Sequence, residues 1–202
     1  MISAIVLAAG ESKRMGQVKL LLPWQGKTIL ERVLDALLNS QVDEVILVLG
    51  HEAERIREKV PTQKIKVVIN PDYKKGMSTS IRRGLLALDE KAQGFMVVLG
   101  DQPKIGKETL NRLISEFQRV YPEKNIVLPA YHGFRGHPVL FSVKYLEEAL
   151  RLEGDVGCRQ ILADHPEDIL TVPVNTDAVL FDIDTPEDYR ENLKRKSSGE
   201  PA

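Results

Sequence analysis

The sequence predicts a three-layer α/β fold with a doubly wound, mainly parallel sheet. Short runs rich in Val, Ile and Leu, such as residues 2–7 and 45–49, have the near-continuous apolar character of strands that are buried on both faces. Longer segments with apolar residues at helical spacing separate these runs. Strands that alternate with helices along a chain are typical of a parallel sheet covered by helices on both faces. A chain of 202 residues, 43% of them apolar, can bury a core of ordinary size.

Eight apolar runs are predicted to be strands: residues 2–7, 45–49, 66–69, 95–99, 125–128, 138–141, 169–172 and 179–183. Two segments between them carry the clearest helical spacing: Ile29, Leu30, Val33, Leu34, Leu37 and Leu38 in the first, and Leu110, Leu113, Ile114 and Phe117 in the second. Residues from about 130 to 160 break the alternation, and we expect a small inserted lobe there. Residues 1–193 are expected to form one domain, and the polar segment 194–202 is expected to fray.

Charge and composition exclude several classes of protein. The formal net charge is -1, so no global field favours nucleic acid or a membrane surface. The apolar start runs at once into glycine and charge, which predicts a buried strand in a cytoplasmic protein and not a signal peptide. No apolar run approaches the ~18 residues of a membrane span. Cys158 is the only cysteine, which excludes an internal disulfide, and no Cys-His signature marks it as a nucleophile.

A glycine-punctuated loop with two cations follows the first predicted strand. Gly10 and Gly16 bracket Arg14, and Lys19 lies shortly beyond. Small residues let backbone N–H groups approach phosphate oxygens, and the cations would favour a triphosphate. The loop does not have the Gly-Lys-Ser/Thr ending of a P-loop or the G-x-G-x-x-G dinucleotide fingerprint. The alternative interpretation is a tight surface turn with solvated cations.

Aspartates follow two later strands. Asp101 comes after the strand at 95–99, where a carboxylate can bind a hard cation or can cap the next helix. Asp182 and Asp184 are two residues apart, so they would share one side of a strand. Thr185 is followed by Pro186, which is typical of a helix N-cap with proline at the first position. Capping explains Thr185 but not the paired aspartates.

Four motifs in this order resemble the nucleotidyltransferase family that includes the molybdenum cofactor guanylyl- and cytidylyltransferases. They are LAAGESKRMG at 7–16 with Lys19 beyond it, NP followed by GMSTS at 70–80, GDQP at 100–103 and DIDTPEDY at 182–189. GHPVLF at 136–141 and GDVGCR at 154–159 are similar to acceptor-lobe motifs of the cytidylyl branch. That branch also resembles this chain in its LAAG loop, where the guanylyl branch has LAGG, although it commonly has alanine at the position of Cys158.

The resemblance implies a Rossmann-like nucleotidyltransferase fold with 130–160 as the acceptor lobe. It implies that the nucleotide-binding residues are Leu7, Ala8, Ala9, Gly10, Arg14, Lys19, Asn70 and Ser80. The catalytic residues would be Arg14, Lys19 and Asp101. Mg²⁺ would bind Asp101 and Asp184, with Asp182 as the weaker candidate. The acceptor would contact Arg135, His137, Asp155 and Arg159.

The reaction implied by the resemblance transfers CMP from CTP to the terminal phosphate of the molybdenum cofactor. A molybdoenzyme or its maturation chaperone would be the protein partner, with no role for nucleic acid or a membrane. Three alternatives stay open. The first is a relative of the same fold with guanylyl transfer or a sugar- or alcohol-phosphate acceptor, the second is a non-catalytic nucleotide-binding accessory protein, and the third is a dinucleotide binder, which the missing fingerprint disfavours.

Overall fold

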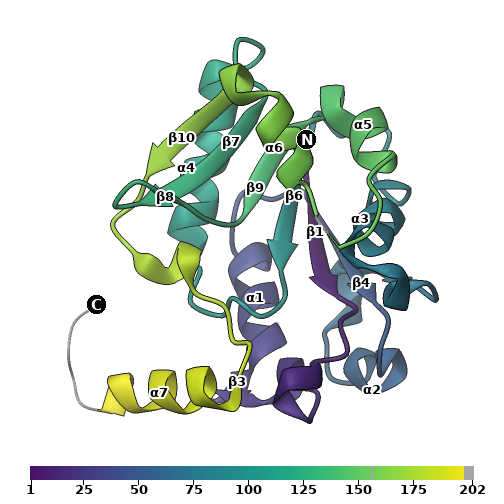
Figure 1. The fold of residues 1–202 in the computed structure, drawn as a ribbon, viewed down its shortest axis with the longest axis vertical. Helices are drawn as coiled ribbons and strands as arrows, with labels where there is room; N and C mark the ends of the chain where they lie inside the picture. The colour runs from purple at the N-terminus through teal and green to yellow at the C-terminus, as the bar shows by residue number, and fades with distance from the viewer. Residues whose placement is uncertain (156, 198–202) are drawn as a thin grey trace.

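The computed structural model describes residues 1–155 and 157–197. Within these residues, eight strands form one sheet in the order β10-β7-β9-β6-β1-β4-β5, with β8 paired to β7 (Figure 1). The sheet is mainly parallel, because β1 pairs in parallel with β4 and β6, β4 with β5, and β7 with β10. Strand β9 runs antiparallel to both of its neighbours, β6 and β7. The predicted fold class is confirmed.

The strands of this sheet are β1 Ile2–Ala8, β4 Glu44–Leu49, β5 Lys66–Ile69, β6 Gly94–Leu99, β7 Ile126–Tyr131, β8 Phe134–Arg135, β9 Val139–Ser142 and β10 Ile169–Pro173. A separate hairpin joins β2 Pro23–Trp24 to β3 Lys27–Thr28. The helices are α1 Ile29–Leu38, α2 Ala53–Arg57, α3 Met77–Leu85, α4 Lys107–Val120, α5 Leu146–Leu150, α6 Arg159–Asp164 and α7 Pro186–Ser197.

Helices cover both faces of the sheet, which explains the continuous apolar character of its strands. Ile5 and Val6 are adjacent on β1 and both fully buried, but they belong to opposite apolar layers. The layer around Val6 contains the apolar faces of α1 and α4, and the layer around Ile5 contains Ile81 of α3 and Ala149 of α5. No helix among the described residues is long and apolar enough to cross a membrane.

The predicted strand at 179–183 is wrong. Residues Asp177–Leu180 form a 3-10 helix, η7, and extended chain follows it up to Asp184. The backbone of this segment bonds to loops and not to a neighbouring strand, since the Val179 carbonyl accepts from His137 N–H at 2.9 Å and Ile183 N–H donates to the Asp101 carbonyl at 3.2 Å. The segment therefore crosses the carboxyl edge of the sheet. Asp182 and Asp184 therefore do not share one side of a strand, contrary to the sequence-based prediction.

The segments at 130–160 and 194–202 both differ in part from the sequence-based expectation. Part of the segment at 130–160 joins the main sheet, because β9 lies between β6 and β7. Other residues of that segment form the β7–β8 turn, α5 and the start of α6. At the other end of the chain, α7 continues to Ser197, into the segment expected to fray, and residues 198–202 lie outside the described part.

A buried polar network closes the amino edge of the sheet, opposite the ends where strands β1 and β6 finish. Asp168 precedes β10 and is buried. Its carboxylate accepts from the backbone and side chain of Asn125 at 3.0 and 3.1 Å, from Lys144 Nζ at 2.9 Å and from the Tyr145 hydroxyl at 2.6 Å. Burial opposes ionisation of Asp168, but these donors outweigh burial and lower its pKa to about 2.

This network predicts a pH-dependent contribution to stability. The pKa of Asp168 is depressed on folding, so its contribution is complete above the unfolded pKa near 3.8 and is lost as the pH falls toward about 2. We expect Asp168→Asn to lower the free energy of unfolding at pH 7 by about 2 kcal/mol, since one pKa unit corresponds to about 1.4 kcal/mol. Urea unfolding at pH 7, 5 and 3 measures the effect. A difference between the two proteins that does not shrink at pH 3 would contradict this account.

Candidate active site

A cleft of about 570 Å³ opens at the carboxyl edge of the sheet. The chain segments after β1, β5 and β6 meet there with the segment that leads into α7. Its lining contains residues 7–14, residues 73–77, and five further side chains that the sequence singled out: Lys19, Ser80, Asp101, Asp155 and Asp184. Parallel strands finish at this edge, which is where α/β sheets bind their ligands.

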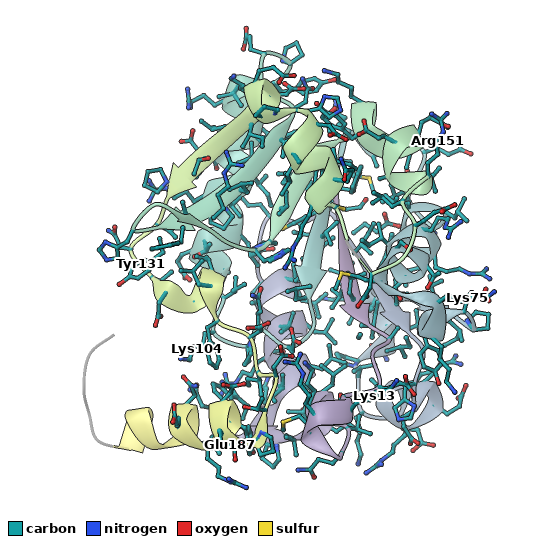
Figure 2. The ribbon with its side chains drawn as sticks, viewed as in Figure 1. Lys13, Lys75, Lys104, Tyr131, Arg151 and Glu187 are labelled. Carbon is teal, nitrogen blue, oxygen red and sulfur yellow. The ribbon has the colours of Figure 1, made fainter. Side chains whose placement is uncertain are left out.

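The loop after β1 is shaped by two left-handed residues and one buried anchor. Ser12 and Gly16 have φ values of 52° and 65°, and they flank the 3-10 turn η1, Lys13–Met15. Met15 is buried, which fixes the turn and leaves Arg14 exposed on the cleft side. A Cβ at Gly10 would meet nothing within 4 Å, so the backbone of Gly10 is open to a ligand. Lys13, the first residue of this turn, lies on the lower part of the molecule (Figure 2).

An ion cluster joins the loop after β1 to Asp101 and Asp184, the carboxylates of the two later motifs. Lys19 Nζ lies 2.5 Å from Asp101 Oδ2 and 3.0 Å from Asp184 Oδ1, and Arg14 donates to Asp184 Oδ2 at 2.8 Å. Burial would lower the pKa of Lys19, but the two carboxylates outweigh burial and raise it. The ammonium is therefore charged at neutral pH.

The start of α7 positions Asp184. Asp188 accepts from the backbone N–H groups of Asp184 and Thr185 at 3.2 and 2.8 Å, and Asp188 N–H donates to Thr185 Oγ1 at 3.1 Å. The predicted N-cap at Thr185 is confirmed. Among the described residues Asp182 forms no ion pair, and burial, followed by the charges of Asp184 and Asp101, raises its pKa. Asp184, and not Asp182, shares the Lys19 ammonium with Asp101.

The carboxylates at this point fit a hard divalent cation. Asp101 Oδ1 is buried without a hydrogen-bond partner, which leaves an oxygen available as a ligand. Among the described residues, no three His, Cys, Asp or Glu side chains converge as a complete metal site. Mg²⁺ usually binds through one or two carboxylates together with substrate phosphates, which suits a pair of aspartates beside a phosphate cleft.

The two predicted nucleotide-pocket residues beyond β5 differ in position. Ser80 lines the cleft. Asn70 is fully buried, and its amide donates to Thr79 Oγ1 and Ser80 Oγ at 2.9 Å each while its carbonyl accepts from Asp72 N–H. Asn70 therefore lies beneath the cleft wall and ties β5 to α3.

The four predicted acceptor residues do not form one cluster. Asp155 lines the cleft, where it caps α3 by accepting from Met77 N–H at 2.9 Å. The Gly154–Asp155 backbone also packs on Gly76, where φ is 115° and a Cβ would lie 2.4 Å from the Gly154 carbonyl oxygen. Arg135 is exposed on β8. Arg159 begins α6.

His137 feels the charges of both Arg159 and Asp101. Burial lowers its pKa, the charge of Arg159 lowers it further, and the charge of Asp101 opposes both effects. Its ring nitrogen Nδ1 is buried without a hydrogen-bond partner. A neutral imidazole with an open nitrogen can bind a polar substrate group, but it is a poor general acid at neutral pH.

Several cleft residues were not identified from the sequence. Tyr73, Lys74 and Met77 line its wall, and Glu11 pairs with Lys13 at 3.0 Å. The sequence signal that could have identified the wall residues is the run Tyr73-Lys74-Lys75 immediately before Gly76. The thiol of Cys158 has a pKa raised to about 12 by burial, so it is not a nucleophile at neutral pH.

Comparison with known proteins decides the family. Residues 4–169 match the model of MobA-like NTP transferase domains. The chain belongs to the MobA-like NTP transferases. Strands β4 to β9, the β1 loop and Asp101 lie within the matched span, whereas most of β10 and Asp184 lie beyond it.

Relatives of this nucleotidyltransferase match over nearly its whole length. It is 31% identical to the molybdenum cofactor cytidylyltransferase of Escherichia coli, with 93% of each chain covered. It is 29% identical to the nicotine blue oxidoreductase of Paenarthrobacter nicotinovorans, with 92% of this chain and 93% of the relative covered. The crystal structure of Rv0371c from Mycobacterium tuberculosis in complex with manganese superposes with a TM-score of 0.81 at 33% identity and covers 96% of this chain and 98% of that one.

The position of Asp101 leads to a direct prediction. Its carboxylate faces the cleft and is not part of the apolar core, so Asp101→Ala should fold normally and lose turnover by several orders of magnitude. Pyrophosphate release at saturating Mg²⁺ and circular dichroism check the two halves of this prediction. More than about a tenth of the wild-type rate in the variant would contradict the role of Asp101.

Proposed function

We propose that this enzyme transfers CMP from CTP to the terminal phosphate of molybdopterin or the molybdenum cofactor, with release of pyrophosphate. The observation that carries the proposal is the cluster of Lys19, Arg14, Asp101 and Asp184 at one edge of a cleft. Transfer between two phosphate-bearing substrates needs this combination of cations and carboxylates, because repulsion between the anions is the main obstacle.

Residues of this chain would prepare the nucleotide for attack. The backbone from Leu7 to Gly10 would contact the base, and Arg14 and Lys19 would hold the triphosphate and stabilise charge on the leaving group. Asp101 and Asp184 would hold Mg²⁺, whose chemistry there is to neutralise phosphate charge and orient the reacting groups. The manganese in the Rv0371c structure supports a divalent cation in this family.

The chemical step needs no protein nucleophile. An oxygen of the acceptor phosphate forms a bond to the α-phosphorus of CTP, the bond from that phosphorus to the bridging oxygen breaks, and pyrophosphate leaves. A terminal phosphate has a second pKa of about 6, so the attacking oxygen is ionised at neutral pH without a general base. This agrees with the lowered pKa of His137, which favours a neutral ring that binds the acceptor.

CTP is the proposed nucleotide, on the basis of the LAAG loop and the similarity to the Escherichia coli cytidylyltransferase. Ala9 is buried, and its methyl group lies against Gly50, where an added Cβ would come within 2.9 Å of it. Any discrimination by Ala9 would come through the backbone position that this packing sets.

Other functions of the same fold are the alternatives. A guanylyltransferase, or an enzyme with a sugar- or alcohol-phosphate acceptor, would use the same loop and aspartates. A non-catalytic accessory protein would bind a triphosphate without releasing pyrophosphate. The name of the Paenarthrobacter relative denotes an oxidoreductase, and the lysine–carboxylate cluster found here favours phosphoryl chemistry.

Pyrophosphate release tests the proposal. Each nucleoside triphosphate is assayed alone, with molybdenum cofactor and with its metal-free pterin. The proposal requires release that depends on a pterin phosphate. Tight nucleotide binding with no release for any pair would favour the accessory protein, and release with another phosphorylated acceptor would move the enzyme to a different branch of the fold.

CTP should be the preferred nucleotide by roughly ten- to two-hundred-fold over GTP in kcat/KM, because shape discrimination in a pocket is typically worth ~1–3 kcal/mol. Initial rates of pyrophosphate release with both nucleotides at one acceptor concentration give the ratio. A preference for GTP would place the enzyme in the guanylyl branch.

His137 and Arg159 should act on the acceptor and not on CTP. His137→Ala and Arg159→Ala are expected to raise the KM for the acceptor or to lower turnover, while the Kd for CTP stays within about threefold, because neither residue lines the nucleotide cleft within the described chain. Calorimetric titration of CTP beside acceptor kinetics separates the two effects. A stably folded His137→Ala protein that no longer binds CTP would overturn this assignment.

A further inference from the structure

Lys19 contacts one oxygen of each carboxylate that would bind the proposed metal. Its ammonium lies within 3.0 Å of one oxygen from Asp101 and one from Asp184, so it is centred where the two carboxylates converge. Only 14% of the Lys19 side chain is exposed, against 81% for Lys13 on the neighbouring turn. A divalent cation and this ammonium cannot both take the same position between the carboxylates.

The charges make the two cations competitors. Lys19 and Arg14 already neutralise the two negative charges of Asp101 and Asp184. A divalent cation added to that neutral cluster would face two fixed positive charges a few ångströms away, where repulsion in a partly buried site is substantial. A metal that binds the two oxygens contacted by Lys19, Asp101 Oδ2 and Asp184 Oδ1, therefore requires that Lys19 first leave them.

The ammonium of Lys19 can also reach the cleft where the triphosphate is proposed to bind. It lines the nucleotide cleft together with Arg14 and residues 7–10, and its four-carbon stem can turn the ammonium away from the carboxylates. Its backbone stays fixed, since Leu20 beside it is buried and Leu22 N–H donates to the Lys19 carbonyl at 3.1 Å. Triphosphate oxygens in the cleft would draw the ammonium toward them and free Asp101 and Asp184 together.

We propose that Lys19 is a built-in competitor for the metal site, which makes tight metal binding depend on the nucleotide. This inference rests on the proposed nucleotidyl transfer for the identity of the triphosphate. Coupling between two ligands is reciprocal, so the metal raises nucleotide affinity by the same factor. The enzyme would then exclude free divalent cations from its carboxylates until a triphosphate is in place.

Binding of Mn²⁺ to the full-length protein tests the proposal without any turnover. The free Mn²⁺ signal in electron paramagnetic resonance gives the Kd without nucleotide and with a non-hydrolysable CTP analogue. Lys19→Gln and Lys19→Met should bind Mn²⁺ at least tenfold more tightly than the wild type in the absence of nucleotide. The CTP analogue should tighten Mn²⁺ binding by a larger factor in the wild type than in either variant.

Matched variants identify the site that is measured. Lys13→Gln removes a nearby exposed lysine and should leave the Mn²⁺ affinity within about twofold of wild type, since Lys13 pairs with Glu11 and not with the two aspartates. Adding Asp101→Asn to Lys19→Gln should abolish the gain. Mn²⁺ affinity that is equal or weaker in both Lys19 variants, or a gain that survives Asp101→Asn, would overturn the proposal. If the Lys19 variants bind Mn²⁺ more tightly than the wild type but the wild type releases no pyrophosphate, only the proposed transfer is contradicted.

Discussion

The contact of Lys19 with Asp101 and Asp184 is the interaction around which the site is organised. It joins three segments that are distant in sequence: the loop after β1, the end of β6 and the segment before α7. Further contacts fix each segment. Leu20 is buried beside Lys19, the Asp101 carbonyl accepts from Ile183 N–H, and the Asp188 carboxylate accepts from the N–H groups of Asp184 and Thr185 at the start of α7. Figure 1 shows α7 and the turn after β1 at the same end of the sheet.

The sequence was sufficient for the parts of the fold that depend on burial. Strands such as β1 and β4 lie between two apolar layers, so their composition alone identifies them. The N-cap at Thr185 follows from local hydrogen bonding and was also predictable. Asp101 and Lys19 were predictable as site residues for a related reason, since each follows a strand whose carboxyl end must face the ligand edge.

Other features depend on contacts between distant segments, and the sequence pattern does not contain them. The run at 179–183 is apolar because Val179 and Ile183 are buried against the edge of the sheet, and its backbone bonds to loops and not to a strand. Asn70 and Asp155 were predicted as ligand-binding residues, and the fold gives each of them a structural contact that the sequence does not show. Asn70 ties β5 to α3, and Asp155, which lines the cleft, also caps α3.

The most direct test of the account is a crystal structure of the protein with Mn²⁺ and a non-hydrolysable CTP analogue, with anomalous diffraction to locate the metal. The account predicts one manganese peak between Asp101 and Asp184, with the ammonium of Lys19 moved from those carboxylates to the triphosphate. A manganese peak that contacts neither aspartate, or a nucleotide bound while Lys19 keeps both of its carboxylate contacts, would contradict it.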